Sequence, residues 1–350
     1  MSRFYNIVIG PETAPQTTAG GLTAASQNSG ATWTNFVNGK ADLGAQTVEL
    51  DICNYTIDSP VSAGMIKIWG PTKEQISQVS DFNYAPIQVF AGMQNGLPLA
   101  TAAVASGQQG LIGSGIIIQS FANWQGINQT LDFVIVPSQV GLQSNPANIS
   151  FNWKKGTPLA DAINSVITTA YPSFKAPQIN ISSDLVLGQD MPFVYQTMTQ
   201  FGQFIRRISQ TIKGGTYQGV LIAQNGNQYV VFDDSNPSGQ TIVAIQQQDL
   251  IGQVTWLGVQ KIQFNTVMRA DLNLTSVVTL PPIAGLTAVT NTNSASNLRA
   301  KNTFSGTWKI TNVRNIGNSR SPDPQSWIST FEAISSSAPP DATSTSASSS

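Results

Sequence analysis

The sequence contains no histidine and a single cysteine, Cys53. Without histidine the chain has no Ser–His–Asp or Cys–His catalytic arrangement, no histidine-ligated metal and no imidazole proton shuttle. A lone cysteine also excludes an internal disulfide and a cysteine-rich zinc site. Carboxylates alone can carry some hydrolytic chemistry, so these absences reduce the enzyme classes open to the chain without removing all of them.

Charge is scarce as well. Asp, Glu, Lys and Arg make up 10% of the 350 residues, against about 25% in typical soluble domains. Asn and Gln take their place, with 57 of the 350 residues. The net charge of −1 leaves no basic excess for sequence-specific nucleic-acid binding. A polar, nearly uncharged surface suits a protein covered by partners better than a free cytosolic monomer; compositional drift is the alternative interpretation.

Long apolar runs are missing too. None approaches the roughly 20 residues that a membrane-spanning helix requires. The opening MSRFYNIVIG has one Arg and an apolar run of three residues, 7–9, unlike a signal peptide. We therefore expect neither a membrane span nor a leader.

Residues 1–137 consist mostly of short strand-like segments separated by Gly, Pro and Asn. In segment 47–56, Val48, Leu50 and Ile52 alternate with Glu49, Asp51 and Cys53. The further predicted strands are 65–70, 86–92, 110–121 and 129–136. Such spacing predicts an antiparallel barrel or sandwich, interrupted by one short helix over 71–82 with Pro71 near its start.

The run GLIGSGIIIQSFANWQG at 110–126 has no charge and is spaced by glycines. It lacks the third glycine of a dinucleotide-binding loop and the lysine of a phosphate-binding loop. Ile112, Ile116 and Ile118 share strand parity, and the glycines permit a bend or a close backbone approach. We interpret it as a barrel strand.

A linker at 137–148 leads into a segment with helical periodicity. One helix is expected over 156–172, with Thr157 as its cap and Pro158 at its first position. A second is expected within 192–215 and ends at Gly214 and Gly215. Its apolar stripe comprises Val194, Met198, Phe201, Ile205, Ile208 and Ile212. A hairpin over 219–234 follows.

Strand patterns return after residue 240, at 262–272, 276–282, 304–313 and 326–334, with a loop rich in Thr, Asn and Ser at 287–300. The predicted fold is therefore mainly β with an α+β insert. Two antiparallel β-barrel domains, 1–137 and 240–335, flank a small α+β domain, 138–239. The Ser-rich residues 336–350 cannot form a core alone and are expected to be a flexible tail.

Five stretches, taken together and in order, resemble the baseplate hub protein of contractile-tailed bacteriophages. The resemblance covers roughly residues 45–335. The stretches are IQVFAGMQNGLPLA (87–100), NWQGINQTLDFV (123–134), FNWKKGTPLADAI (151–163), VMRADLNLTSVVTLPP (267–282) and GTWKITNVRNIGNSRSPDPQSWISTFEAI (306–334). Related hubs occur in tail-like bacteriocins and in the type VI secretion spike.

The resemblance implies a homotrimeric ring in the virion tail, assembled in the cytoplasm of the bacterial host. Each subunit of that family contributes two similar β-barrels, so a trimer presents six barrels to a hexameric tail tube. The other face stays three-fold and receives a trimeric central spike. The mismatch in symmetry is solved without six copies of the chain. The lumen passes the tape measure protein and DNA. No enzyme activity, catalytic residue, cofactor or metal is implied.

Four groups of residues were weighed for chemistry. Glu49 and Asp51 could act as paired carboxylates in a cell-wall hydrolase, or mark the solvent side of a strand. The cluster DDSNPSG from Asp233 could hold Ca²⁺ or form a turn. Arg206 and Arg207 could be solvated, or one could pair with an acidic group on a neighbouring subunit. The tryptophans are expected to be core or interface anchors: Trp124, Trp153, Trp256, Trp308 and Trp327. A non-enzymatic carbohydrate-binding tail-tip protein is a further alternative.

Overall fold

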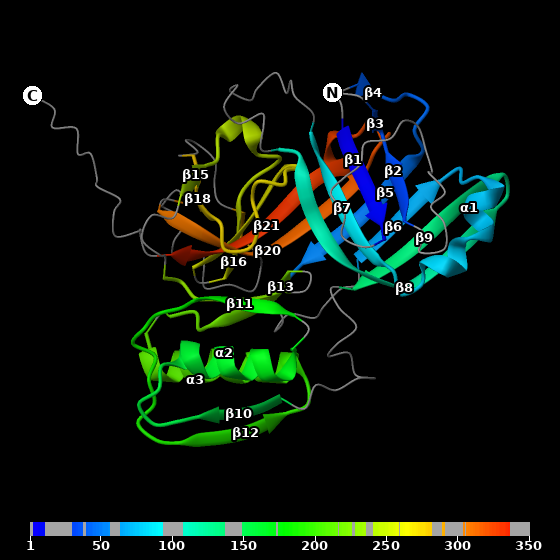
Figure 1. The fold of residues 1–350 in the computed structure, drawn as a ribbon. Coiled ribbons are helices and arrows are strands. Elements are labelled where there is room, and N and C mark those ends of the chain that lie inside the picture. Colours follow the sequence, from blue (N-terminus) through cyan, green and yellow to red (C-terminus); the bar gives the residue numbers. More distant parts are fainter. Residues whose placement is uncertain are drawn as a thin grey trace, which may run out of the picture.

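The computed structural model is mainly β and shows two strand-rich regions beside a smaller, helix-containing insert (Figure 1). It describes residues 3–10, 30–37, 40–56, 64–93, 108–136, 149–172, 174–215, 217–225, 228–235, 241–258, 260–281, 289–290, 304 and 306–336. The predicted linker at 137–148, most of the loop at 287–300 and the tail after Ser336 lie outside these residues.

The amino-terminal β region pairs its main strands antiparallel in the order β5-β6-β9-β8-β7-β1-β2. The strands predicted at 47–56, 65–70, 86–92, 110–121 and 129–136 are all present. The alternation of β5 is confirmed, because Val48, Leu50 and Ile52 are buried. The predicted helix forms as a short α-helix followed by a 3-10 turn. The elements are β1 (Arg3–Ile9), β2 (Ala31–Thr34), β3 (Phe36–Val37), β4 (Lys40–Ala41), β5 (Thr47–Asn54), β6 (Gly64–Trp69), α1 (Lys73–Ser77), η1 (Val79–Phe82), β7 (Pro86–Met93), β8 (Gly110–Gln125) and β9 (Asn128–Val136).

Strand β8 contains the glycine-spaced run, and its glycines are sites of close backbone approach. A β-carbon at Gly115 would collide with the backbone oxygen of Val136 on β9. The expected shared face of the isoleucines is wrong in detail: Ile112 and Ile117 are buried, whereas Ile116 and Ile118 are half-exposed. The cause is a register shift against each neighbouring strand, which reverses the side-chain alternation.

Replacing Gly115 with alanine is expected to destabilise the protein by about 1–3 kcal/mol, the usual cost of overpacking a filled interior. The new methyl group meets a backbone atom, which cannot rotate away. Chemical denaturation measures the change. Gly188→Ala is the matched control, because a β-carbon at Gly188 meets nothing within 4 Å. Equal midpoints for the two variants would contradict the packing described for β8.

The carboxy-terminal β region has its own core around Trp256, Phe264, Trp308 and Phe331. Its long strands β17, β21 and β20 pair antiparallel, and β18 pairs with the start of β20. Its elements are β15 (Ile242–Ala244), η2 (Gln247–Asp249), β16 (Thr255–Gly258), β17 (Lys261–Val267), β18 (Val277–Thr279), β19 (Val289–Thr290), β20 (Thr307–Asn318), η4 (Pro324–Ser326) and β21 (Trp327–Ser336).

The two β regions share one continuous sheet, because the second half of β20 pairs with β5. Among the described residues this 14-stranded sheet runs along an open path from β19 to β2, with β15 and β18 beside it. The mainly β fold class is thus confirmed. Closure into two barrels, and the domain boundaries at 137, 239 and 335, stay predictions.

The insert packs two helices between a two-stranded and a three-stranded sheet (Figure 1). Its core includes Trp153, Ile163, Phe201 and Tyr229. In order, its elements are β10 (Ile149–Trp153), α2 (Leu159–Ala170), β11 (Lys175–Asn180), β12 (Met191–Tyr195), α3 (Met198–Lys213), β13 (Leu221–Asn225) and β14 (Gln228–Phe232). The predicted hairpin is the antiparallel pair β13–β14.

Both helix starts differ from the prediction. Pro158, not Thr157, occupies the N-cap position of α2, and no side chain caps that end. Helix α3 begins at Met198 with Thr197 as its cap, so Val194 lies outside it, on β12, and is exposed. The helical spacing of Val194 is coincidental, because residues 191–195 pair with β10. The end at Gly214 is confirmed. Among the described residues, every helix is too short or too polar to cross a membrane.

Candidate functional site at the seam between the two β regions

We call the contact between β5 and the second half of β20 the seam. Its antiparallel register runs from the pair Asn54–Val313 to the pair Glu49–Asn318. Arg314 donates two hydrogen bonds across it to Asp51, from Nε to Oδ1 at 2.9 Å and from Nη2 to Oδ2 at 2.6 Å. Glu49 Oε1 accepts a hydrogen bond from Asn318 Nδ2 at 2.9 Å. Polar cross-strand pairs therefore follow the outer face of the seam.

This arrangement gives both carboxylates proposed for hydrolysis a structural partner. The hydrogen bonds from Arg314 hold the pKa of Asp51 below its usual range. A general acid in glycoside hydrolysis needs the opposite shift, because it must stay protonated near neutral pH. The geometry of Glu49 and Asp51 thus favours strand pairing over catalysis.

At one end the seam reaches the insert. Thr56, just beyond β5, forms an isolated bridge with Ala223 of β13. The backbone N–H of Thr56 also donates to Asn312 Oδ1 at 3.2 Å, and Asn312 Nδ2 donates to Glu332 at 2.7 Å. Lys261 lies 2.6 Å from the same Glu332 oxygen. Five strands from all three parts of the chain therefore meet at this end: β5, β13, β17, β20 and β21.

At the other end, Trp327 of β21 enters the core of the amino-terminal region. It is 1% exposed, and its indole Nε1 donates to the backbone oxygen of Gly92 at 3.0 Å. A β-carbon at Gly317 would lie 2.6 Å from the Trp327 ring, so glycine is needed there for the ring to fit. The first core is therefore completed by a residue from the second β region.

Asp233, the residue considered for calcium, is fully buried where the insert meets β20. Its Oδ2 accepts hydrogen bonds from Ser182 N at 2.8 Å, Ser182 Oγ at 2.7 Å and Tyr217 OH at 2.9 Å. Its Oδ1 accepts from both N and Oγ of Ser235. Protein donors therefore satisfy both carboxylate oxygens, and the calcium interpretation gains no support.

Lys309 of β20, also fully buried, completes this junction. Its ammonium group donates to the backbone oxygens of Asp233, at 3.0 Å, and of Ser235. Burial lowers the pKa of Lys309 to about 8, with Asp233 and Asp234 opposing the shift. Burial acts to raise the pKa of Asp233, but hydrogen bonds from Ser235 and Ser182 outweigh it and leave that pKa lowered. The Lys309 ammonium thus ties the backbone of Asp233 and Ser235 to β20, while the Asp233 carboxylate fixes that segment to Ser182 and Tyr217.

The two arginines of α3 lie in different surroundings. Arg206 is half-buried, and its Nε donates to the backbone oxygen of Gln218 at 3.3 Å. Arg207 is exposed, and within the described part of the chain its side chain forms no ion pair. Pairing of either with a neighbouring subunit stays a prediction.

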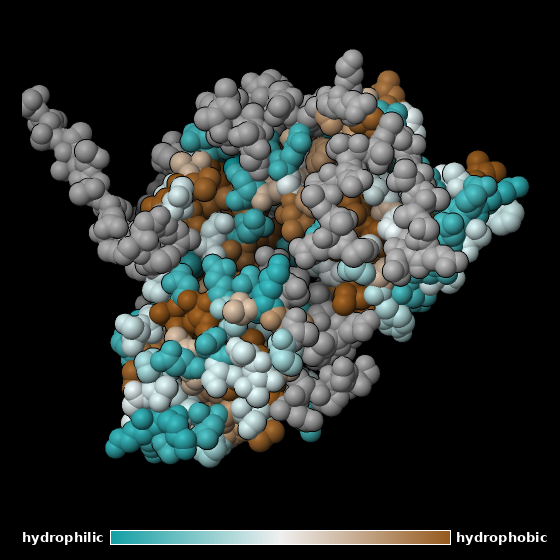
Figure 2. Space-filling view, viewed as in Figure 1, coloured by the Kyte–Doolittle hydropathy of each residue, from teal (hydrophilic) through white to brown (hydrophobic). Residues whose placement is uncertain are grey.

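Of the five tryptophans singled out from the sequence, four are core residues, as expected: Trp153, Trp256, Trp308 and Trp327. Trp124 is 74% exposed near the tip of the β8–β9 hairpin, where Ile127 is 97% exposed. In Figure 2 apolar surface is visible at the end of the molecule where this hairpin lies beside α1 in Figure 1.

Sequence reasoning did not identify the partners that matter most here, Arg314, Lys309 and Arg269. Each is contributed by a strand or strand end whose pattern alone does not reveal its neighbour. Among the described residues, no three Cys, Asp or Glu side chains are placed to hold a metal ion together.

No protein-family model matches the chain, and no curated protein matches it. Solved structures align with the chain over most of its length, at low identity and with TM-scores below 0.5. The tail protein from Neisseria meningitidis MC58 is 6% identical, with a TM-score of 0.46, over 95% of this chain and 97% of that one. The 43 kDa tail protein of prophage MuSo2 from Shewanella oneidensis is 8% identical, with a TM-score of 0.47, over 96% and 98%. A Francisella PdpA-VgrG complex is 9% identical, with a TM-score of 0.41, over 95% of this chain and 58% of that one.

Proposed function

We propose that the chain is a structural component of a phage tail, and more specifically a baseplate hub. Three copies would form a ring that joins the hexameric tail tube to the trimeric central spike. The ring would leave a channel for the tape measure protein and DNA. In this proposal the protein belongs to the virion and has no catalytic role.

The observation that carries the proposal is the seam. It fuses two β regions of one chain into a single sheet, with antiparallel hydrogen bonds continuing from one region into the other. A ring built from such chains would repeat six β regions with only three copies, which is how a three-fold assembly can meet a six-fold one. The sequence resemblance and the low surface charge support the same assignment.

The use of charge in the described residues also supports a structural role. Asp51 and Arg314 join the β regions, Asp233 and Lys309 hold the insert, and Lys261 and Glu332 link neighbouring strands. Charged groups whose partners lie inside the fold are suited to fixing geometry. No observation favours the hydrolase or carbohydrate-binding alternatives over this role.

The solution mass of the purified chain tests the proposal. We expect a species of about 112 kDa, three times the 37.2 kDa of one chain, by light scattering after gel filtration. Averaged electron micrographs viewed along the axis should show six similar lobes around a channel. A monomer at every concentration, or a closed assembly without a central opening, would exclude the hub.

A further inference from the structure

A pocket of about 500 Å³ opens beside the seam, where β1, the end of β17 and the β20–β21 turn come together. This volume lies within the range of about 300–1,000 Å³ that is usual for ligand sites. One wall is apolar and is built from Met93, Ile251, Val267, Pro322, Pro324 and Trp327.

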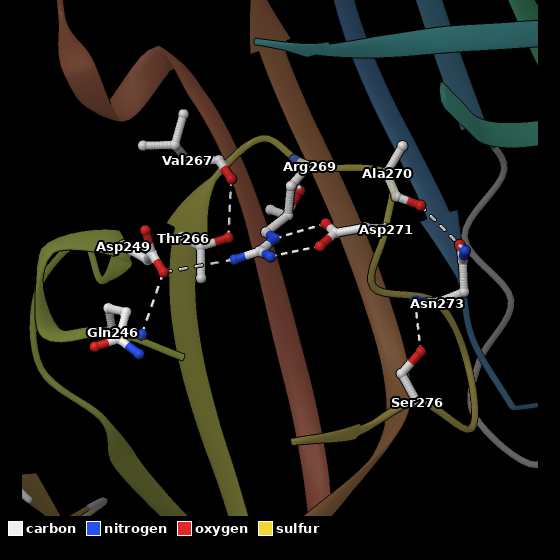
Figure 3. Close-up of polar contacts among 10 residues, drawn as sticks. Gln246, Asp249, Thr266, Val267, Arg269, Ala270, Asp271, Asn273 and Ser276 are labelled. Atoms are coloured by element: carbon white, nitrogen blue, oxygen red, sulfur yellow. Dashed lines mark hydrogen bonds and ion pairs between the residues drawn. The ribbon is translucent and has the colours of Figure 1, made fainter. Parts of the chain in front are cut away.

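The polar wall of the pocket carries three guanidinium groups and one carboxylate, from Arg3, Arg269, Arg320 and Asp249. Arg269 is 3% exposed and its charge is balanced. It binds Asp271 through two hydrogen bonds, of 2.6 Å from Nε and 2.5 Å from Nη2, and its Nη1 lies 3.8 Å from Asp249 (Figure 3). In this triad, a fixed side of the pocket, one guanidinium is shared by two carboxylates.

Arg3 and Arg320 differ from Arg269, because only neutral groups contact them directly. Arg3 donates to the backbone oxygens of Asn318, at 2.5 Å, and Asp323, at 2.8 Å, and its guanidinium lies 5.9 Å from the Trp327 ring. Arg320 donates to the backbone oxygens of Leu43, at 2.8 Å, and Ala45. Within the described residues neither guanidinium forms an ion pair.

Burial lowers the pKa of Arg3, and the nearby charge of Asp323 opposes this only in part. Carbonyl oxygens orient these arginines without neutralising them. A carboxylate brought between the two would gain charge-assisted hydrogen bonds in a partly desolvated site.

We propose that this pocket binds an extended peptide segment of a partner protein. One apolar side chain of the segment lies against the apolar lining at Ile251 and Pro322, and an Asp or Glu carboxylate lies beside Arg3 and Arg320. The apolar wall favours a peptide over nucleic acid, which would require a continuous basic surface. The inference goes beyond the proposed hub function and does not depend on trimer formation.

Selection from a displayed library of random short peptides tests the proposal on the full-length chain. We expect enriched sequences to combine an acidic residue with a large apolar one. A fluorescent copy of an enriched peptide should bind Arg320→Gln about tenfold more weakly than the parent chain, a loss of about 1.4 kcal/mol. Lys73→Gln removes the same charge from an exposed site on α1 and should leave the affinity unchanged.

A second variant guards against misfolding of Arg320→Gln. Ile251→Trp leaves all three arginines in place and adds bulk to the pocket wall, so it should also weaken binding while the circular dichroism spectrum is retained. The proposal is wrong if the selected peptides are not enriched in acidic residues. It is also wrong if the peptide binds the parent chain and both pocket variants with equal affinity. A third contradicting result is displacement of the bound peptide by single-stranded oligonucleotide but not by an excess of the unlabelled peptide.

Discussion

Asp233→Ala is expected to lower the free energy of unfolding by about 3–5 kcal/mol, because each buried donor left without an acceptor costs about 1–3 kcal/mol. The substitution leaves Ser182, Tyr217 and Ser235 with unpaired donors and deprives Lys309 of its buried counter-charge. Because these groups lie between the insert and β20, the junction should open before the β regions unfold. Urea denaturation measures the loss, and limited proteolysis in native buffer should show faster cleavage around residue 235.

Asp233→Asn is the matched variant, because it keeps the size of the side chain and one carbonyl acceptor. It should cost less than Asp233→Ala. Combining either with Lys309→Met should recover part of the loss, since no buried cation then remains unpaired. Full additivity of the Asp233 and Lys309 substitutions would show that the two groups do not interact.

Asp233 and Lys309 also make the free energy of unfolding depend on pH, and their pKa shifts fix the direction. The folded pKa of Asp233 lies below its unfolded value, so its contribution is present above about pH 3.9 and is lost as the pH falls through the folded value. Lys309 changes stability in the same direction but in a higher pH range. Its folded pKa of about 8 lies below the unfolded value of about 10.4, so stability should rise with pH between the two. In Lys309→Met this alkaline gain should disappear.

Trp327→Ala is expected to cost about 3–5 kcal/mol, the usual price of truncating a fully buried aromatic side chain. Although Trp327 belongs to β21, it fills the core of the amino-terminal region and bonds to Gly92. Thermal unfolding followed by circular dichroism measures the shift. Trp327→Phe retains most of the packing and loses the hydrogen bond, so it should cost less.

The location of the effect separates a packing defect from general damage. Hydrogen exchange should accelerate in β1, β7 and β8 of Trp327→Ala, far from residue 327 in sequence. Trp124→Ala truncates the same side chain at an exposed position and should change stability by less than about 0.5 kcal/mol. If protection changed only in β20 and β21, the account of a shared core would be wrong.

Periodic patterns predicted much of this fold because they report which side of an element is buried. The alternation of Val48, Leu50 and Ile52 predicted strand β5. The helical spacing of Leu159, Ile163 and Val166 predicted helix α2. The same reasoning placed Val194 on α3, because a spacing of four to Met198 fits a helix. Pairing with β10, about 40 residues earlier in the chain, decides the matter, and only the capping residue Thr197 marks the true start locally.

The seam and its charged pairs were beyond sequence reasoning for a different reason. Asp51 and Arg314 are separated by 263 positions, and Asp233 and Lys309 by 76. A single sequence contains no record of which remote strands meet, so Glu49 and Asp51 were assessed without their partners. Arg269 lies in the segment 262–272 that was predicted as a strand, and a charged residue there would be expected on the solvent side, yet it is buried. Asp271, two residues later, was the local sign that its charge could be neutralised inside the protein.

Strands β5 and β20 are far apart in the sequence, and this separation affects how the chain folds during translation. The insert makes its core from residues 149–231 and can fold while later residues are still within the ribosome. Strand β5 cannot pair with β20 until the chain through Asn318 has left the ribosome. Until then, β5 is an unpaired edge of the amino-terminal sheet. Glu49 and Asp51 lie along that edge, and exposed charges discourage a waiting strand from joining the same strand of another nascent chain. We therefore expect the two carboxylates to oppose aggregation of the newly made chain until they pair with Asn318 and Arg314.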